Sequence, residues 1–214
     1  MSISVDESIK KENPESTQER ERRKARQPTF PINPLLLNRW SPRSMTGEEM
    51  DDDTMMSLFE AARWAPSSYN NQPWRFIYAK RNSPYWNRLF DLAAEPNKVW
   101  AKNAALIVVV VSNKHFDING KYSITHQYDA GAAWENLALE ASARGLVAHG
   151  MQGFDYERAR ADLGIPDSFD VMAMIAIGKR GPKENLPTNL QEKESPNGRK
   201  PLREIVMEGR FMEK

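Results

Sequence analysis

Apolar residues between positions 50 and 66 recur at the spacing of an α-helix. The stripe has members at i, i+3, i+4 and i+7, namely Met55, Leu58, Phe59 and Ala62. This period places them on one helical face, and the pattern stops at Pro66 because proline cannot continue a helix. The run from Thr46 to Glu49 matches a capping box. We therefore predict a helix that begins near Thr46 and buries one face.

Further apolar runs have the composition of β-strands. Residues 104–111 form a continuous run rich in valine, which predicts a strand buried on both faces. Residues 171–177 predict a second buried strand, and residues 76–79 a short one. Another helical stripe lies between residues 76–79 and residues 104–111 and consists of Trp86, Leu89, Phe90 and Ala93. Because helices and strands alternate, we predict an α+β fold with a mixed central sheet and helices on both faces.

Residues 129–141 predict a long central helix with two different faces. One face is apolar and consists of Trp134, Leu137, Ala138 and Ala141. The beginning of the helix has small residues instead: Ala130, Gly131, Ala132 and Ala133. Small residues allow another backbone to approach closely, either from a second subunit or from the same chain. The residues alone leave both uses open.

Composition limits the class of protein. A chain of 214 residues is long enough for one substantial core, so one domain is the default expectation. The balance of 30 basic against 29 acidic residues argues against a general nucleic-acid or membrane-surface protein. With no cysteine, the chain has no disulfide or thiolate chemistry. No apolar run approaches the roughly 20 residues that cross a bilayer, and no signal peptide is evident, so we predict a cytoplasmic protein.

Residues 1–28 are polar and highly charged, with almost no apolar residues to bury. This composition predicts a flexible tail or an exposed helix, followed by a single domain over residues 29–214. The basic cluster in residues 19–26 could contact nucleic acid or anionic lipid, but glutamates interrupt it. We therefore expect a solvated arm, with neither nucleic acid nor membrane as a partner.

The loop over residues 65–76 is rich in hydroxyl and carboxamide side chains between Pro66 and Pro73. Each proline fixes its own φ and restricts the preceding residue, so the loop is stiff and presents its polar side chains at a low entropic cost. Ser, Asn and Gln both donate and accept hydrogen bonds, which suits a heteroaromatic ring edge or a polyhydroxylated chain. An ordinary turn between a helix and a strand is the alternative.

Two arginines and a serine lie close together upstream of this loop, at Arg39, Ser41 and Arg43. If a helix over residues 35–39 ends there, the three side chains could converge on one phosphate, because the guanidinium group offers a planar donor fork. A solvated basic turn is the alternative for this segment taken alone.

Together, residues 39–44 and 65–76 resemble, in order and separation, the nitroreductase family of FMN-dependent oxidoreductases. Residues 129–147 resemble the long central helix of that family and the segment after it. Residues 150–155 are similar to its flavin-edge loop, and residues 198–202 to its C-terminal phosphate contact. The resemblance spans about residues 33–207. It implies a nitroreductase-like fold and a homodimer with exchanged terminal extensions.

The resemblance also implies a flavin site shared between subunits. Arg39, Ser41 and Arg43 would bind the FMN phosphate together with Arg199. The backbone N–H of Gly153 would lie near flavin N5, the atom that accepts the hydride. The flavin would be lined from the partner subunit by Pro66, Ser67, Ser68 and Asn70.

One motif departs from the family pattern. Where the family has Pro-x-Glu-Gly-Phe, this chain has Gly-Met-Gln-Gly-Phe at residues 150–154. Gln152 thus replaces a carboxylate beside the flavin. Removing this negative charge is expected to ease formation of the reduced, anionic flavin.

The resemblance implies a ping-pong oxidoreductase. NADH or NADPH would deliver hydride to the flavin, and a flat small-molecule acceptor such as a nitroaromatic or a quinone would then take its place. Candidates for an aromatic-lined slot are Trp40, Tyr69, Phe116, Tyr122, Tyr128 and Phe154. Flavin reductases, dehalogenases and oxidases share the scaffold, and residues 113–127 are the central insertion that could serve as their lid. A flavin-binding regulator or carrier without turnover is the remaining alternative.

The chain has three histidines, His115, His126 and His149. Their spacings match no common metal motif, so we predict no metal site and a hydrogen-bonded structural or surface role for each. His149 adjoins the flavin-edge loop and is the candidate proton donor to product.

Overall fold

The computed structural model describes residues 26–212. These residues belong to two compact units. The larger unit is Pro31–Glu194 and contains the sheet, and the smaller one combines residues 26–30 with residues 195–212. No helix in residues 26–212 is long and apolar enough to cross a membrane. The charged tail predicted for residues 1–28 lies almost entirely outside the described residues, and the single domain over residues 29–214 stays a prediction.

The larger unit alternates helices and strands as the pattern predicts. In chain order the elements are α2 (Pro34–Asn38), α3 (Asp52–Arg63), the 3-10 turn η1 (Ser68–Asn70), β1 (Trp74–Lys80), α4 (Trp86–Phe90), α5 (Glu95–Ala101), β2 (Leu106–Asn113), α6 (His126–Ala143), β3 (Leu146–Met151), α7 (Tyr156–Asp162), β4 (Phe169–Lys179), η2 (Lys183–Asn185) and α8 (Thr188–Gln191). The smaller unit contains the 3-10 turn η3 (Leu202–Glu204).

The four strands form one sheet in the order β1-β2-β4-β3. Ile77 of β1 pairs with Val109 of β2, which in turn pairs with Met174 of β4. Ala148 of β3 pairs with Ile177 at the other end of β4. All three pairings are antiparallel, whereas the sequence pattern suggested a mixed sheet. Periodicity predicts which residues are buried, but it carries no information on the direction in which a strand enters the sheet.

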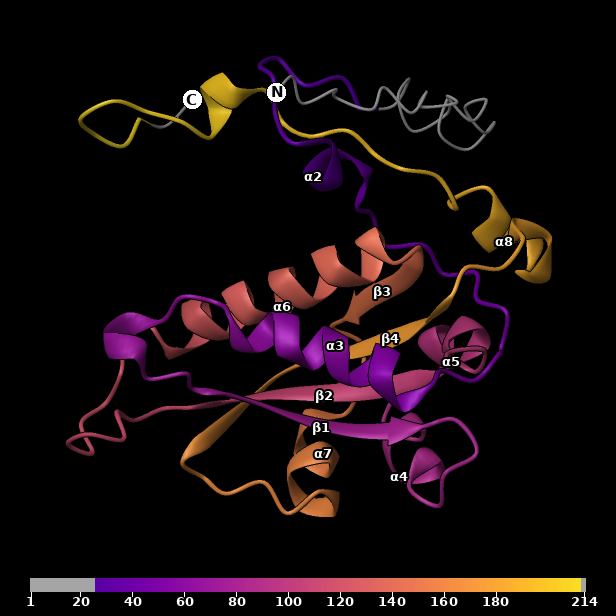
Figure 1. Cartoon of the computed structure of the whole chain (residues 1–214), viewed down its shortest axis with the longest axis horizontal. Helices are drawn as coiled ribbons and strands as arrows, with labels where there is room; N and C mark the ends of the chain where they lie inside the picture. Colours follow the sequence, from indigo (N-terminus) through magenta and orange to yellow (C-terminus); the bar gives the residue numbers. More distant parts are fainter. Residues whose placement is uncertain (1–25, 213–214) are drawn as a thin grey trace, which may run out of the picture. The chain divides into compact units, whose positions relative to one another are not determined.

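Helices cover both faces of the sheet, as predicted, with α3 and α6 on one side and α4 and α7 on the other (Figure 1). The side chains of β2 alternate between two apolar clusters. Ile107 and Val109 belong to the cluster that contains α4, α5 and α7 residues. Val108 and Val110 belong to the cluster that contains α3 and α6 residues. The prediction of a strand buried on both faces is therefore confirmed, and so is the α+β fold.

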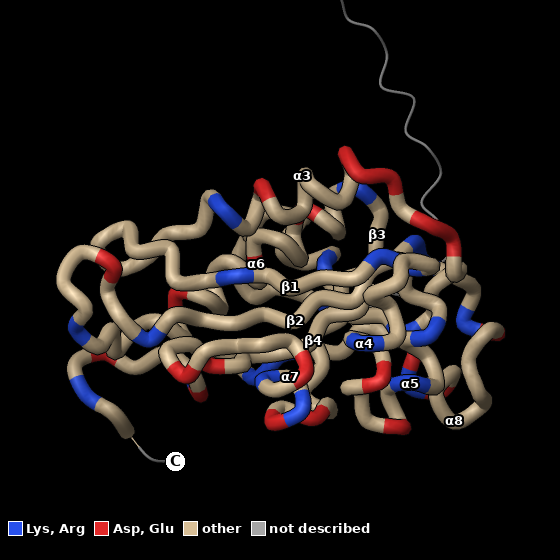
Figure 2. The backbone as a smooth tube through the Cα atoms, turned by 90° about the horizontal axis from the view of Figure 1, so that it is seen from below, with Lys and Arg blue, Asp and Glu red and all other residues tan. Residues whose placement is uncertain are grey.

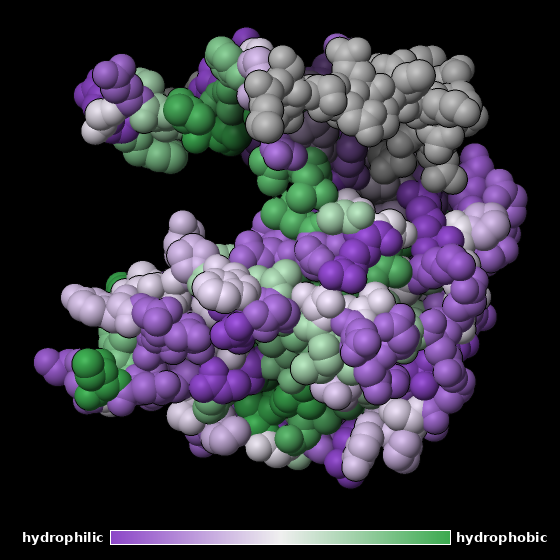
Figure 3. Space-filling view, viewed as in Figure 1, coloured by the Kyte–Doolittle hydropathy of each residue, from purple (hydrophilic) through white to green (hydrophobic). Residues whose placement is uncertain are grey.

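The surface is mixed in character. Lysine or arginine and acidic residues both occur on α5 and α7, so these helices carry charges of both signs (Figure 2). Hydrophobic side chains reach the surface over β1, which forms one edge of the sheet (Figure 3). The side chain of Tyr78 in this strand is 42% exposed.

The first predicted helix begins later than the capping-box pattern suggested. Gly47 has φ +82°, a left-handed conformation that a right-handed helix cannot contain. The helix α3 instead starts at Asp52, and the Asp51 carboxylate accepts a hydrogen bond of 2.7 Å from the Thr54 N–H. The prediction of a start near Thr46 is wrong, because a second N-cap signal lies five residues further on.

Part of the segment after β4 is buried, although its composition is polar. Residues 179–199 are mostly polar, a composition typical of an arm that runs over the surface. Leu186 is only 5% exposed and belongs to the apolar core, and Glu194 is 6% exposed. A buried glutamate among charged, exposed neighbours has no signature in the sequence, because its burial depends on distant backbone partners.

Candidate functional site

The segment from Arg39 to Ser44 is held to the rest of the larger unit by its backbone. Arg39 caps the C-terminal end of α2, and Pro42 is buried. The Glu194 carboxylate accepts hydrogen bonds of 2.8 and 3.0 Å from the Arg43 N–H and one of 2.9 Å from the Ser44 N–H. The peptide groups on both sides of the Arg43 side chain therefore have fixed partners.

His149 of β3 holds the same segment from the sheet. Its Nδ1 lies 2.9 Å from the Pro42 carbonyl oxygen, and its ring centroid lies 4.6 Å from that of Trp100. Burial lowers the pKa of His149 below its usual value. A carbonyl can only accept, so Nδ1 carries the proton of a neutral ring. The structural role predicted for His149 is thus visible, and the role of proton donor to product stays a prediction.

The side chains of this segment offer donors for an anion. The Arg39 Nε lies 3.2 Å from the Glu135 carboxylate on α6. Within residues 26–212, the Arg43 guanidinium and the Ser41 hydroxyl form no hydrogen bond or ion pair, although both residues are half-buried. A half-buried guanidinium and a hydroxyl two residues apart on a fixed backbone match the kinds of donor that a phosphate group requires.

The loop after α3 is strained. Tyr69, Asn70 and Gln72 have φ values of 52°, 54° and 47°, a left-handed region that non-glycine residues rarely adopt. The Ser67 hydroxyl accepts a hydrogen bond of 3.0 Å from the Gln72 N–H across this turn. Such a conformation persists only where surrounding contacts hold it, and in this loop those contacts come from two distant elements.

The first of these elements is α6, whose Asp129 carboxylate accepts a hydrogen bond of 3.1 Å from the Ser68 N–H. The second is the β2–α6 connection. The Asn71 side chain donates to the His115 carbonyl at 3.2 Å and accepts from the Asp117 N–H at 2.9 Å. The predicted flavin-lining loop and the predicted lid, residues 113–127, are therefore joined by one asparagine amide.

The loop after β3 approaches α5 closely. The Gly153 carbonyl accepts hydrogen bonds of 2.9 Å from the Ala94 N–H and from Asn97 Nδ2. A Cβ atom at Gly153 would lie only 2.8 Å from Asn97 Nδ2, so a side chain here would displace the Asn97 amide from its hydrogen bond to the Gly153 carbonyl. Within the described part of the chain the Gly153 N–H has no hydrogen-bond partner. Gln152 beside it is exposed.

The structure separates the aromatic candidates for a slot. Phe154 is 7% exposed and stacks against Tyr156 in the core, and the Trp40 ring is covered by the Arg180 guanidinium at 4.5 Å. The exposed candidates are Tyr69 at 89%, Tyr128 at 81% and Tyr122 at 60%. Tyr69 meets Phe116 edge to face, with ring centroids 5.6 Å apart.

The predicted site residues form separate groups within one chain. Residues 66–70 contact Asp129 at the N-terminal end of α6, whereas residues 39–43 contact β3, which follows the C-terminal end of α6 (Figure 1). Arg199 belongs to the smaller unit, where its Nη1 donates to the Gly198 carbonyl at 3.0 Å. The predicted sharing of the site between two subunits agrees with this separation and stays a prediction.

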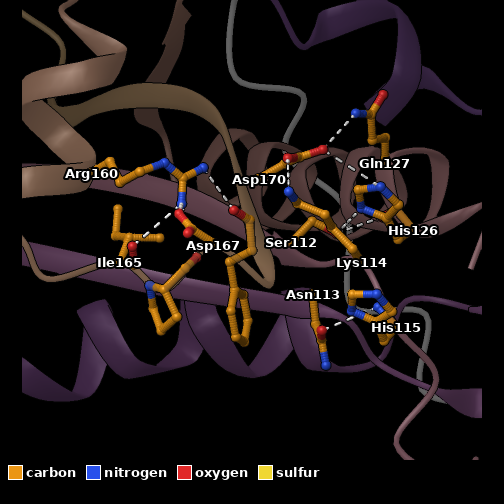
Figure 4. A network of polar contacts seen from close by, with 12 residues as sticks. Ser112, Asn113, Lys114, His115, His126, Gln127, Arg160, Ile165, Asp167 and Asp170 are labelled. Atoms are coloured by element: carbon orange, nitrogen blue, oxygen red, sulfur yellow. Dashed lines mark hydrogen bonds and ion pairs between the residues drawn. The ribbon is translucent and has the colours of Figure 1, made fainter. Parts of the chain in front are cut away.

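A second polar network lies beside α7 and has a structural role (Figure 4). His126 is fully buried, with Nδ1 3.0 Å from the Ser112 Oγ and Nε2 3.6 Å from an Asp170 carboxylate oxygen. Ser112 is also fully buried, and its hydroxyl donates to the His126 carbonyl at 2.8 Å. This serine cannot act as a nucleophile, because no substrate reaches it and its proton is already donated to a carbonyl oxygen.

Asp170 connects that network to the surface. Its carboxylate accepts from Gln127 Nε2 at 3.0 Å and lies 3.2 Å from Lys114 Nζ. A cavity of about 310 Å³ lies next to it and is lined in part by Arg160. This guanidinium donates to the Pro166 and Phe169 carbonyls at 2.8 Å. No group of three or more potential metal ligands occurs among residues 26–212.

The structure is an α+β fold in which the segment from Arg39 to Ser44 is attached to the sheet through His149. The model of the Nitroreductase family matches residues 36–99 and 81–179, and the chain belongs to this family of oxidoreductases. The resemblance identified from the sequence motifs is confirmed at family level.

Similar proteins agree with this assignment. A solved structure described as an oxidoreductase containing FMN is 44% identical, with a TM-score of 0.85 over 88% of this chain and 97% of that one. A Desulfovibrio desulfuricans structure in complex with FMN is 27% identical, with a TM-score of 0.64 over 85% of this chain and all of that one. An NADH dehydrogenase of Thermus thermophilus is 26% identical over 211 residues, covering 84% of this chain and 97% of the relative.

Several residues of the site have no signal in the sequence. Glu194 lies 150 residues from Ser44, and Asp129 lies 61 residues from Ser68. Asn97 reaches Gly153 from another helix. Of these residues, only Asn71 lies in the polar loop over residues 65–76 that the sequence indicated as a candidate site. The residues that Asn71 contacts were not predictable from the sequence.

Proposed function

We propose that this enzyme is an FMN-dependent NAD(P)H oxidoreductase that reduces a flat small-molecule acceptor by a ping-pong mechanism. The observation that carries the proposal is the segment with Ser41 and Arg43, two half-buried donor residues on a backbone held by Glu194 and His149. The FMN-containing relatives, at 44% and 27% identity, support the choice of cofactor.

In this proposal the FMN phosphate is held by Arg39, Ser41 and Arg43, and Arg199 contributes a further charge. Guanidinium groups bind phosphate oxygens through paired hydrogen bonds, which suits a cofactor group with a charge of about −2. The Arg39 Nε also lies 3.2 Å from the Glu135 carboxylate, which fixes this side chain at the edge of the segment.

The flavin ring would be lined by two loops. Pro66, Ser67, Ser68 and Asn70 would face it from a partner subunit, so the active site would require a homodimer. The Gly153 N–H would donate toward N5, and it has no competing acceptor in residues 26–212. Gln152 would place a neutral amide where the family pattern has a carboxylate. Bound flavin supplies the electron-transfer chemistry, and the protein supplies binding, orientation and electrostatics.

The exposed aromatic residues support a flat acceptor. Tyr69 presents an almost fully exposed ring on the same strained loop as Ser68 and Asn70. Its edge-to-face contact with Phe116 fixes the orientation of the ring without covering it. A nitroaromatic or quinone could stack there while it takes up electrons.

An absorbance spectrum of the purified protein, followed by anaerobic addition of NADH or NADPH, tests the proposal. A flavin spectrum that is released as FMN and bleached by either nucleotide would support it. Flavin that binds but fails to bleach would indicate a regulator or carrier without turnover. Failure to bind added FMN would remove the proposed function altogether.

A further inference from the structure

Glu194 joins two distant parts of the larger unit. It is the last residue of that unit, and its side chain is 6% exposed. Its carboxylate accepts three hydrogen bonds of 2.8, 3.0 and 2.9 Å from the backbone N–H groups of Arg43 and Ser44. A buried carboxylate is costly unless it is fully hydrogen-bonded, so these bonds determine where the side chain lies.

The carbonyl groups of the same segment also have fixed partners. The Pro42 carbonyl lies 2.9 Å from His149 Nδ1, and the Ser44 carbonyl accepts from the Gly181 N–H at 3.0 Å. Among the groups that flank Arg43, Glu194 is the one that holds the Arg43 peptide itself. Without it, two adjacent N–H groups would lose their acceptor, and the Arg43 backbone could rotate.

The N–H groups of Arg43 and Ser44 both donate to the same oxygen, Oε1 of Glu194. An internal carboxylate thus uses these backbone donors, so an external anion has to be bound by side chains. Within this segment, the side chains of Ser41 and Arg43 form no hydrogen bond or ion pair with any of residues 26–212. The backbone N–H groups thus bind Glu194, and the side chains stay available for an external anion.

We propose that Glu194 is a positioning residue for the FMN phosphate, an inference that rests on the proposed function. Its carboxylate fixes the Arg43–Ser44 backbone, and this presents the Arg43 guanidinium to the phosphate from a rigid base. A negative charge near a phosphate is unfavourable, so the contribution of Glu194 is geometric and not electrostatic.

The charge and the geometry can be separated by substitution. Glu194→Gln keeps an oxygen that accepts from the backbone but removes the charge, so FMN affinity should stay within about threefold of wild type. Glu194→Ala removes the acceptor, and FMN should bind about tenfold more weakly or worse, as expected when charge-assisted hydrogen bonds are lost. Glu192→Ala, at an exposed position two residues earlier, is the matched control.

The experiment is a fluorescence titration of the full-length apoprotein with FMN and, separately, with riboflavin. The dissociation constant for riboflavin divided by that for FMN measures the contribution of the phosphate to binding. We expect Glu194→Ala to lower this ratio about tenfold while riboflavin binding stays unchanged, and Glu192→Ala to leave both constants unchanged. Equal weakening for both flavins would indicate general structural damage and overturn the inference.

A double variant tests whether Glu194 acts through Arg43. In the Arg43→Ala background, Glu194→Ala should have little further effect on FMN affinity, and full additivity would contradict the proposal. If Glu194→Ala does not fold, Glu194→Asp replaces it, because the shorter side chain keeps the charge but reaches the N–H groups poorly. A wild-type phosphate ratio in Glu194→Asp would overturn the inference. Failure of wild type to bind FMN would instead remove the proposed function.

Discussion

The carboxylate of Asp129, in the first turn of α6, accepts a hydrogen bond of 3.1 Å from the backbone N–H of Ser68. The same oxygen lies 3.3 Å from the Thr125 hydroxyl, and the Asp129 side chain is almost completely buried. One carboxylate thus joins the start of the central helix to the strained loop that contains Tyr69. The shape of this loop depends on α6 as much as on its own residues.

Replacing the Asp129 carboxylate should loosen this connection. Asp129→Asn leaves the size nearly unchanged but removes a charged acceptor, so we expect a loss of about 1–3 kcal/mol in the free energy of unfolding. Denaturant unfolding measures it. Asp53→Asn, at an exposed position of α3, should change stability little. Equal stability of Asp129→Asn and wild type would show that the carboxylate is dispensable.

Asn71 should couple the motion of two segments. Asn71→Ala removes both of its hydrogen bonds to the β2–α6 connection, so the left-handed residues of the loop lose a restraint. Hydrogen–deuterium exchange should then rise in residues 67–72 and 114–120 together. Asn87→Ala, at an exposed position of α4, serves as the control. Faster exchange in only one of the two segments would argue against coupling through this amide.

Tyr69 should influence which acceptors are reduced. If the exposed ring stacks on a flat acceptor, Tyr69→Ala should lower kcat/KM for quinones or nitroaromatics by roughly 2–10-fold, the usual range for one aromatic contact. The rate with ferricyanide, which does not stack, should be unchanged. Tyr85→Ala removes another exposed tyrosine and should affect neither substrate. A parallel loss with both acceptors would assign Tyr69 to the loop conformation instead.

Gly153 should be sensitive to an added methyl group because of its contact with Asn97. In Gly153→Ala the new methyl group would lie 2.8 Å from Asn97 Nδ2, so the amide has to move and loses its hydrogen bond to the Gly153 carbonyl, at a cost of about 1 kcal/mol of stability. Adding Asn97→Ala creates space for the methyl group. Chemical denaturation of the single and double variants should show that the double variant loses less than the sum of the two changes. Strict additivity would contradict the direct contact.

Stability should decrease below neutral pH because of His126. Burial lowers the pKa of His126 in the folded protein, although the Asp170 and Asp129 carboxylates oppose this effect and Lys114 adds to it. The unfolded chain therefore binds a proton more readily, at a pKa of about 6.5. The stabilisation is complete above this value and is lost as the pH falls toward the lower pKa of the folded state.

Unfolding free energies measured between about pH 5 and 7.5 test this origin of the pH dependence. His126→Asn should flatten the slope relative to wild type. The pKa of His149 is also lowered by burial, so His149→Gln should remove a separate part of the same slope. An unchanged slope in His126→Asn would mean that the imidazole does not titrate differently in the two states.

Much of the fold was predictable because helices and strands leave local periodic patterns. The stripe from Met55 to Ala62 lies in α3, and the valine-rich run of residues 104–111 lies in β2. Burial of alternate residues and one-sided helical faces depend on neighbours within a few positions, which a sequence displays directly. The family was recognisable for the same reason, since its motifs are short contiguous runs such as residues 39–44.

The contacts that hold the candidate site depended on the tertiary structure. Glu194 reaches Arg43 and Ser44, and Asp129 reaches Ser68, across separations of 61 to 151 residues. The left-handed Gly47 and the antiparallel strand order were likewise invisible to periodicity. The sequence by itself determined the residue types of the site and the elements that carry them. Which polar groups meet was decided only by the fold, because a buried polar group takes its partner from whatever backbone the packing brings near.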